Sequence, residues 1–373
     1  MYVQGAVLLL CKALVNGMAK SKMALSRSFR ALRANKVALM LCTLFLFSLL
    51  LTPRPQNLNS DMGTESREDT IARLKYLQSK CGELCDSKRV IIEKENGFGQ
   101  TRAQVDCKWL LSEDLIDASD QEAPYRVPSE FMEDYTMNGR VKFGRFPKHK
   151  KQTYLGKNAS KPVWNKKMVE ALKRKALAGK YGFGTYRAED TKSVFQVLQA
   201  TGIKNMSVLV VGSEKPWVEA LCLAGGASRV TTLEYGAIQT DHPQLATYTP
   251  KVFHSAYIGG KLEPFDAVVS FSSLEHSGLG RYGDALNPWG DLMAVARIWC
   301  VTKDDGLLFL GVPSGPDCVQ FNAHRIYGRV RYPFLVTNWE KVDSFTGNDL
   351  KFDSKDCSYF KNQKLLTFRK VNK

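Results

Sequence analysis

Short apolar runs alternate with helix-like segments across the second half of this 373-residue chain. Four of these runs are rich in Val, Leu and Phe and end at a polar residue or a glycine; they cover 207–212, 229–235, 265–276 and 306–313. Buried strands that are separated by helices are typical of a parallel sheet covered on both faces. The pattern therefore predicts an α/β fold built on a mostly parallel sheet.

Further elements follow from the same kind of pattern. Apolar residues at helical spacing predict an amphipathic helix over 162–177, and proline at a first turn predicts helices that begin at Pro216 and Pro288. A third strand is expected near 252–255, between the second and the third of the runs above. The sheet should thus be completed within the same half of the chain.

Polar residues and a glycine stand where the predicted strands end. Gly212 follows the first strand and Glu234 follows the second, while Ser272, Glu275 and His276 follow the run that starts at 265. Ligands of parallel sheets bind beyond the carboxyl ends of the strands. We therefore expect these five residues to surround one ligand site.

Two motifs carry a family resemblance. One is Ser-Ser-Leu-Glu-His-Ser-Gly-Leu-Gly-Arg-Tyr-Gly-Asp at 272–284, and the other joins Gly-Val-Pro at 311–313 to Asn-Ala-His-Arg-Ile-Tyr-Gly at 322–328. With the strand ends described above, they resemble the domain of unknown function 268 family, which occurs notably in nematodes. That family is methyltransferase-like. The resemblance implies a Rossmann-like class I S-adenosylmethionine-dependent methyltransferase sheet, with an antiparallel final hairpin of strands 339–345 and 365–371.

The resemblance also implies a donor, S-adenosylmethionine, and a site for it. A carboxylate at the end of the second strand, Glu234, can accept both ribose hydroxyl hydrogens, and Tyr235 can pack against the adenosine. Gly212 lets a ligand approach the backbone. Glu214 either meets the methionine amino group or complements the dipole of the next helix. The implied donor site comprises Gly212, Glu214, Glu234, Tyr235, Ser272 and Glu275.

Methyl transfer to a hydroxyl needs a base that removes the acceptor proton. His324 is the preferred base on sequence grounds, with His276 and Asp284 as the other catalytic candidates. Guanidinium and phenol groups can orient an anionic acceptor. The residues expected in that role are Arg281, Arg325 and Tyr327.

The N-terminal segment predicts a membrane anchor. Residues 1–36 contain seven Lys or Arg and no acid, and 37–51 is a run of 15 residues without a charge. This length is a little short of the roughly 20 residues that span an average bilayer and suits thinner membranes of the early secretory pathway. Residues 51–55 make a poor cleavage site. We expect a single-pass type II protein of the Golgi or endoplasmic reticulum, with its basic tail in the cytosol and the rest in the lumen.

Seven cysteines follow the predicted anchor. An oxidising lumen allows disulfides, and Cys81, Cys85 and Cys107 are expected to staple a small region before the sheet. Cys222 and Cys300 lie in apolar helical stretches and are expected to be small buried hydrophobic residues. Because seven is odd, at least one cysteine should lack an intramolecular partner.

Charge and glycosylation patterns bear on partners. The net charge is +16, and 140–180 holds fourteen Lys or Arg against the single acid Glu170. This basic stretch predicts either a surface for an acidic glycan or, with more weight, a solvated helix face. No nucleic-acid-binding motif accompanies the charge, so no nucleic-acid partner is expected. Asn158-Ala-Ser and Asn205-Met-Ser fit the glycosylation pattern.

The predicted organisation is a tail (1–36), an anchor (37–51), a stem (52–70), a cysteine-containing region (71–160) and a methyltransferase-like domain (161–373). The leading hypothesis is an enzyme that methylates a lumenal acceptor, plausibly a glycan hydroxyl. Since the loop after the first strand has one glycine, a catalytically degenerate binding or scaffolding protein is the alternative. A nucleotide-sugar transferase is less favoured, because no paired-acid metal motif stands out. A metal site of Asp284, Asp291 and His276 has nonspecific spacing, so no metal is expected.

Overall fold

The computed structural model describes residues 65–93, 99–112, 126–145, 161–342, 352, 357 and 363–372. They lie in one compact unit, Met62–Lys373, so the predicted regions 71–160 and 161–373 share a unit. The predicted anchor at 37–51 and the Asn158 triplet lie outside the described residues. Within the described ranges, we find no helix with the length and apolar character of a membrane span.

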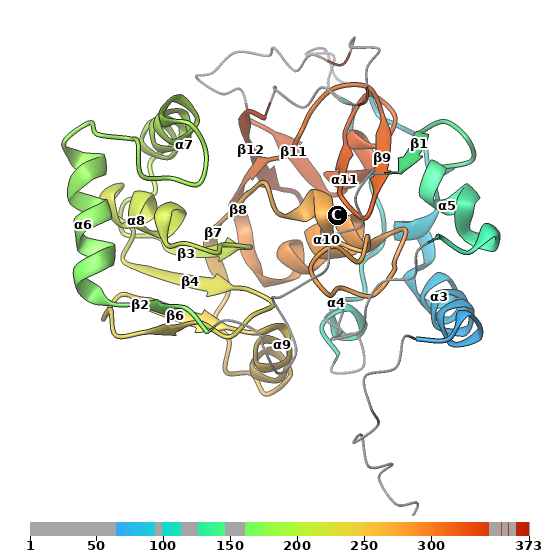
Figure 1. The fold of residues 1–373 in the computed structure, drawn as a ribbon, viewed down its shortest axis with the longest axis horizontal. Coiled ribbons are helices and arrows are strands. Elements are labelled where there is room, and N and C mark those ends of the chain that lie inside the picture. Colours follow the sequence, from blue (N-terminus) through green and yellow to red (C-terminus); the bar gives the residue numbers. More distant parts are fainter. Residues whose placement is uncertain are drawn as a thin grey trace, which may run out of the picture. The chain divides into compact units, whose positions relative to one another are not determined.

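A seven-stranded sheet forms the centre of this unit, in the order β11-β12-β8-β7-β3-β4-β6 (Figure 1). Neighbouring strands are parallel, except that β12 runs antiparallel to both β8 and β11. The mixed α/β fold and the antiparallel final hairpin agree with the sequence prediction. The strands are β3 (Ser207–Val211), β4 (Arg229–Leu233), β6 (Leu245–Tyr248), β7 (Phe265–Phe271), β8 (Thr302–Gly311), β11 (Trp339–Lys341) and β12 (Leu365–Lys370).

The third strand of the prediction was misplaced. It was expected near 252–255, but those residues belong to helix α9 (Pro250–Ile258), and the strand is β6, which ends at Tyr248. Pro250 occupies the first turn of α9, where its fixed φ and missing N–H suit a helix start. Phe253 is buried and Val252 is exposed, so this apolar pair belongs to an amphipathic helix and not to a strand.

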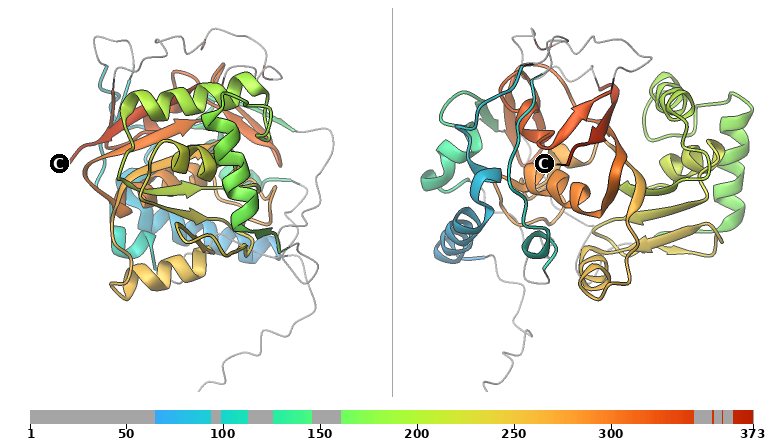
Figure 2. Two further views of the ribbon diagram at one scale, coloured as in Figure 1. Left: turned by 90° about the vertical axis from the view of Figure 1, so that its left-hand side faces the viewer. Right: turned by 180° about the vertical axis from the view of Figure 1, so that it is seen from behind.

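Both faces of the sheet are covered. Val208 and Val210 pack in one buried cluster with helices α6, α7 and α8, whereas Leu209 packs in the other with α9 and α10. This alternation follows from the two-residue period of a strand. Figure 2 shows α6 and α7 (green) in front of the sheet in its left panel. The helices are α6 (Lys166–Leu177), α7 (Ala188–Thr201), α8 (Trp217–Ala224) and α10 (Gly290–Val301).

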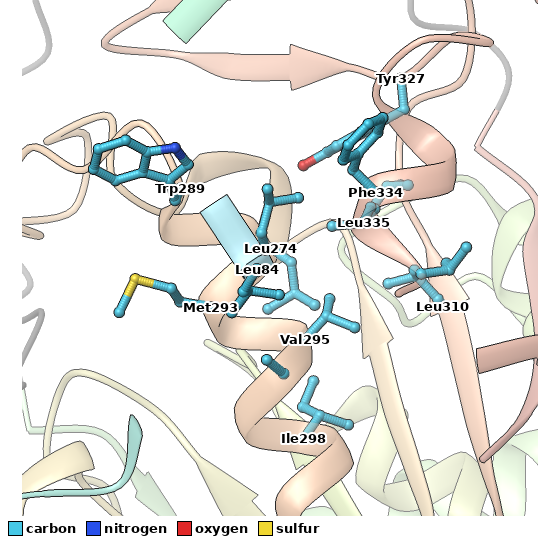
Figure 3. Packing of buried hydrophobic residues seen from close by; sticks show 14 of the residues in the cluster. Leu84, Leu274, Trp289, Met293, Val295, Ile298, Leu310, Tyr327, Phe334 and Leu335 are labelled. Atoms are coloured by element: carbon cyan, nitrogen blue, oxygen red, sulfur yellow. The ribbon is translucent and has the colours of Figure 1, made fainter. Parts of the chain in front are cut away.

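The described residues of 65–145 pack on the α10 side. Leu74, Leu84 and Tyr135 belong to the same buried cluster as α10, part of which is drawn in Figure 3. Strand β1 (Lys142–Arg145) pairs parallel with β9 (Cys318–Phe321), so this region also extends a second sheet. The other elements are α3 (Arg67–Cys81), η2 (Gly82–Cys85), α4 (Cys107–Leu110), η3 (Ser129–Phe131), α5 (Met132–Thr136), β2 (Val163–Trp164), β5 (Gln239–Thr240), η4 (Leu274–His276), β10 (His324–Ile326) and α11 (Tyr332–Leu335).

Disulfides connect distant parts of the chain. Cys81 joins Cys85 within the N-terminal region, but Cys107 joins Cys300 on α10. The prediction of Cys300 as a simple buried hydrophobic residue was therefore wrong, because packing brings α4 onto α10. A third bond joins Cys318 to Cys357. Cys222 is a buried free thiol, as its apolar surroundings predicted.

Candidate active site

A cavity of about 230 Å³ opens at the carboxyl ends of β3, β4 and β7. The end of β3 contributes Val211 and Gly212, the end of β4 contributes Leu233 and Glu234, and the end of β7 contributes Phe271. This is the position at which parallel sheets bind ligands. The polar groups predicted from the strand ends are thus brought to one place.

The turn after β3 requires glycine. Gly212 has a φ of +77°, and a Cβ at this position would collide with the side chain of Ser273. The turn is fixed further by a hydrogen bond of 3.0 Å from the Gly212 N–H to the Leu233 carbonyl. The loops after β3 and β7 therefore touch, and they meet at the mouth of the cavity.

Glu234 links the turn to the end of β4. Its Oε2 accepts the Ser213 N–H at 2.8 Å and its Oε1 accepts the Tyr235 N–H at 2.7 Å. Burial raises the pKa of Glu234 to about 7, although the two N–H groups act in the opposite direction. Glu234, Tyr235 and the exposed Glu214 all line the cavity. A carboxyl group held in this way keeps oxygen lone pairs for hydroxyl donors of a ligand.

A second acid supports the same turn and was not identified from the sequence. Glu219, on α8, is 0% exposed and accepts hydrogen bonds from Ser213 Oγ at 3.0 Å and Thr232 Oγ1 at 2.8 Å. Burial raises its pKa to about 7. The sequence offers no signal for this role, because an acid in the first turn of a helix usually faces water and complements the dipole.

The segment after β7 contains residues that line the cavity and one residue that supports them from behind. Ser272 and His276 line the cavity, whereas Glu275 does not. Glu275 is 1% exposed and accepts a hydrogen bond from Ser272 Oγ at 2.8 Å; among the described residues, its Oε2 has no hydrogen-bond partner. Burial raises the pKa of Glu275 to about 7. The structure therefore places Glu275 behind the cavity wall, where it holds Ser272.

The ring of His276 has a fixed orientation. Its Nδ1 lies 2.5 Å from the Ala323 carbonyl oxygen, so Nδ1 carries the proton and donates it. Burial and the nearby Arg281 lower the pKa of His276 well below its ordinary value, which keeps the ring neutral. In this tautomer Nε2 carries a lone pair. His276 is therefore a neutral imidazole on the cavity wall, and its Nε2 lies 3.6 Å from Oε1 of Glu275.

His324 occupies a different position. It lies on β10, is 7% exposed and is not among the residues that line the cavity, although its ring centroid is 6.4 Å from that of His276. The structure thus brings the two histidines together but places only His276 at the cavity. The sequence ranking preferred His324, but both histidines follow strands of the predicted sheet, so the pattern could not show which of them lines the cavity.

Asp284 organises the loop that follows His276. Its Oδ2 accepts the N–H groups of Leu279 and Gly280 at 3.0 and 3.1 Å, and its Oδ1 accepts the Tyr282 N–H at 3.1 Å. Burial raises its pKa. Although Asp284 reaches the cavity surface, these three bonds commit it to the loop.

Arg281 stacks on the Tyr282 ring at 5.0 Å and donates to the Ala323 carbonyl at 3.2 Å.

Comparison with known proteins bears on this part of the chain. Residues 205–371 match the family described as Caenorhabditis protein of unknown function, DUF268. These residues, called the DUF268 segment below, make up less than half of the chain. A search of curated proteins gave no match.

Among solved structures, this chain is similar to three methyltransferases, among others. A putative S-adenosylmethionine-dependent methyltransferase from Streptococcus mutans is 14% identical with a TM-score of 0.30; the match covers 48% of each chain, so ours spans about half of that protein. A Burkholderia thailandensis 1,6-didemethyltoxoflavin-N1-methyltransferase with bound S-adenosylhomocysteine is 16% identical (TM-score 0.32; 57% of this chain, 94% of that one). A putative methyltransferase of Haloferax volcanii, solved with the activator Trm112, is 13% identical (TM-score 0.31; 54% and 98%).

Two residues of the DUF268 motif that were expected to bind an acceptor lie away from the cavity. Arg325 and Tyr327 are both 0% exposed. The Tyr327 hydroxyl donates to Asp291 Oδ2 at 3.0 Å, and Arg331 binds the same carboxylate with two bonds of 2.9 and 2.6 Å. Burial by itself would raise the pKa of Asp291, but the charges of Arg325 and Arg331 hold this pKa below its ordinary value. Arg325 and Tyr327 therefore belong to the buried network around Asp291.

Residues from outside the DUF268 segment complete the cavity. Leu111 and Tyr186 both line it. The Tyr186 ring packs edge-on against Phe271 at a centroid distance of 5.2 Å, beside Trp217 at 5.9 Å. These residues were not predicted, because only tertiary packing brings them to the strand ends.

Within the described ranges there is no cluster of His, Cys, Asp and Glu suited to a metal ion.

Proposed function

We propose that this chain is an S-adenosylmethionine-dependent methyltransferase of the secretory pathway. The observation that carries the proposal is the position of Glu234 at the end of β4, on the cavity and hydrogen-bonded to the turn at Gly212. A carboxyl group in this place suits the vicinal ribose hydroxyls of a nucleoside. The seven-strand order with one antiparallel strand is the sheet that the family resemblance implies.

The residues divide into donor and acceptor sides. Gly212, Glu234 and Tyr235 would hold the nucleoside portion, and Glu214 would meet the amino group of the methionine portion. When bound, S-adenosylmethionine supplies an electrophilic methyl group. On the acceptor side, Nε2 of the neutral His276 takes the proton of an acceptor hydroxyl as its oxygen becomes methylated. We favour His276 over His324 for this role, because only His276 lines the cavity.

The compartment is part of the proposal. Three disulfides among the described residues support an oxidising environment, which the lumen of the secretory pathway provides. Together with the anchor predicted at 37–51, they favour a single-pass membrane protein of the Golgi or endoplasmic reticulum with a lumenal active site. The acceptor we propose is a hydroxyl of a lumenal glycan, since glycans are the abundant hydroxyl compounds of that compartment.

Calorimetric titration of the full-length protein with S-adenosylhomocysteine tests the donor site. We expect saturable binding that Glu234→Ala weakens at least tenfold, since a charged or shared-proton hydrogen bond contributes about 1.5–3 kcal/mol. Glu263→Ala is the matched control, because Glu263 is an exposed acid that does not line the cavity. A folded protein that binds no S-adenosylhomocysteine would overturn the proposal. Binding without methyl transfer to lumenal glycoconjugates would favour the degenerate binding protein.

A further inference from the structure

One lining residue of the cavity, Leu111, comes from a short segment that the family match does not include. Segment 107–112 consists of the single-turn helix α4 and the two residues after it, and its Leu111 lines the cavity. Leu111 is 1% exposed. Arg297, Ile298 and Val301 of α10 line the same cavity. The segment and α10 therefore share one region of the wall.

Three links join this segment to the helices around the cavity. A disulfide connects Cys107 to Cys300, with 5.5 Å between the Cα atoms. Arg297 Nε donates to the Leu110 carbonyl at 2.8 Å, and His254 Nδ1 donates to the Ser112 carbonyl at 3.0 Å. Both donors are themselves lining residues of the cavity. The position of the segment and the orientation of these two side chains thus depend on each other.

The disulfide is the covalent member of this set. A helix of one turn is not stable by itself, because its hydrogen bonds do not offset the cost of nucleation. The preceding stretch is anchored elsewhere: Asn338 exchanges two hydrogen bonds with Ala103, at 3.1 and 2.8 Å. The contact with Asn338 fixes Ala103 but does not reach Leu111. The position of Leu111 therefore depends on the Cys107–Cys300 disulfide, the two carbonyl contacts and apolar burial.

We propose that the Cys107–Cys300 disulfide is a positioning element of the donor cavity, so that nucleoside binding depends on the oxidised state of this bond. This inference rests on the proposed function. Reduction breaks the S–S bond and leaves thiols at Cys107 and Cys300. A dithiol supplies the two electrons and two protons and is itself oxidised to a disulfide. Once the bond is lost, only the Arg297 and His254 contacts and apolar burial hold segment 107–112 against α10. The position of Leu111 and the orientations of Arg297 and His254 are then less fixed, and the cavity lining is less well defined.

The test is calorimetric titration of the full-length oxidised protein with S-adenosylhomocysteine. We expect Cys107→Ser/Cys300→Ser to bind at least tenfold more weakly than the wild type. Cys81→Ser/Cys85→Ser is the control, since it removes a disulfide whose residues do not line the cavity, and its affinity should stay within twofold of the wild type. Circular dichroism checks that each variant is folded.

The outcomes separate the two proposals. A folded wild-type protein that does not bind overturns the proposed function and this inference together. Wild-type affinity in Cys107→Ser/Cys300→Ser, or an equal loss in the Cys81→Ser/Cys85→Ser control, overturns this inference alone. If the Cys107→Ser/Cys300→Ser variant does not fold, Leu111→Ala carries the test, because it keeps the disulfide and removes the wall side chain. Unchanged affinity in folded Leu111→Ala then overturns the inference.

Discussion

Two buried carboxyl groups and one half-buried carboxyl group dominate the chemistry of this site at the scale of single residues. Glu219, Glu234 and Glu275 each have a pKa raised to about 7, in every case mainly by burial. Each also receives hydrogen bonds from hydroxyl or N–H groups nearby. Near neutral pH such groups can carry a proton, and a protonated Glu219 can donate to Ser213 Oγ. The turn at Gly212 therefore rests on an acid whose protonation changes in the physiological range.

Glu219 should make stability depend on pH. Its pKa rises from 4.5 in the unfolded chain to about 7 in the folded one. The folded state therefore binds the proton more tightly, and its advantage is complete at low pH and is lost as pH rises from about 4.5 to about 7. Glu219→Gln keeps both hydrogen-bonding partners without a titrating group. Relative to this variant, we expect the wild type to lose at most about 3 kcal/mol of unfolding free energy across that window.

Urea unfolding of both proteins at pH 5, 6, 7 and 8 measures this difference. The other titrating groups are common to the two proteins, so their contributions cancel when the two profiles are subtracted. Parallel stability profiles would show that Glu219 has an ordinary pKa in the folded state.

At the scale of elements, four buried strands and the helices α6, α8 and α10 beside them were predictable from the sequence. The runs at 207–212, 229–235 and 265–276 each contain a strand of the sheet, and the run at 306–313 overlaps β8 (Thr302–Gly311), because a strand buried on both faces is continuously apolar. The third strand, β6, escaped the prediction. Its residues Ala246 to Tyr248 are only half-buried and give no such run.

The site residues at the strand ends were predictable from the sequence, whereas those brought in by packing were not. Gly212 and Glu234 were placed at the cavity because strand ends in a parallel sheet share an edge, a property visible in one sequence. Leu111 and Tyr186 come from segments outside the predicted sheet and reach the cavity by packing. Arg325 and His324 stand on β10, which belongs to a second sheet that the apolar pattern did not reveal.

The contact between the loops after β3 and β7 gives a test at this scale. Gly212→Ala should destabilise the protein for two reasons, the positive φ and the collision of the new Cβ with the Ser273 side chain. Ser273→Gly removes the second reason only. We expect the double variant to recover the steric part, leaving a cost of about 1–2 kcal/mol for the backbone conformation.

Thermal unfolding of the wild type, both single variants and the double variant forms a double-mutant cycle. The coupling energy should be favourable, since the second substitution relieves the first. Additive effects would mean that the two loops do not touch in solution.

At the scale of the whole molecule, the N-terminal region and the DUF268 segment act as one unit. The Cys107–Cys300 bond joins residues 193 positions apart, and β1 pairs with β9 across a similar separation. Gly278, in the loop after His276, accepts a hydrogen bond of 2.9 Å from the Tyr135 hydroxyl. The DUF268 segment by itself therefore lacks Leu111 at the cavity and a support for the loop after His276.

A lumenal location of this unit predicts glycosylation at Asn205. This residue is exposed, at a turn just before β3, and the triplet is completed by Ser207. Glycosidase treatment of the full-length protein from cells should therefore lower its mass, and both Asn205→Gln and Ser207→Ala should remove the glycan at this site. Ser207→Thr is the matched control, because threonine preserves the acceptor pattern and the glycan should remain. Alkylation of intact cells adds an independent measure, since Cys107 and Cys300 should not react while they are bonded in an oxidising compartment. An unglycosylated protein whose Cys107 and Cys300 are alkylated would instead place the domain on the reducing side of the membrane, where the proposed lumenal glycan is absent.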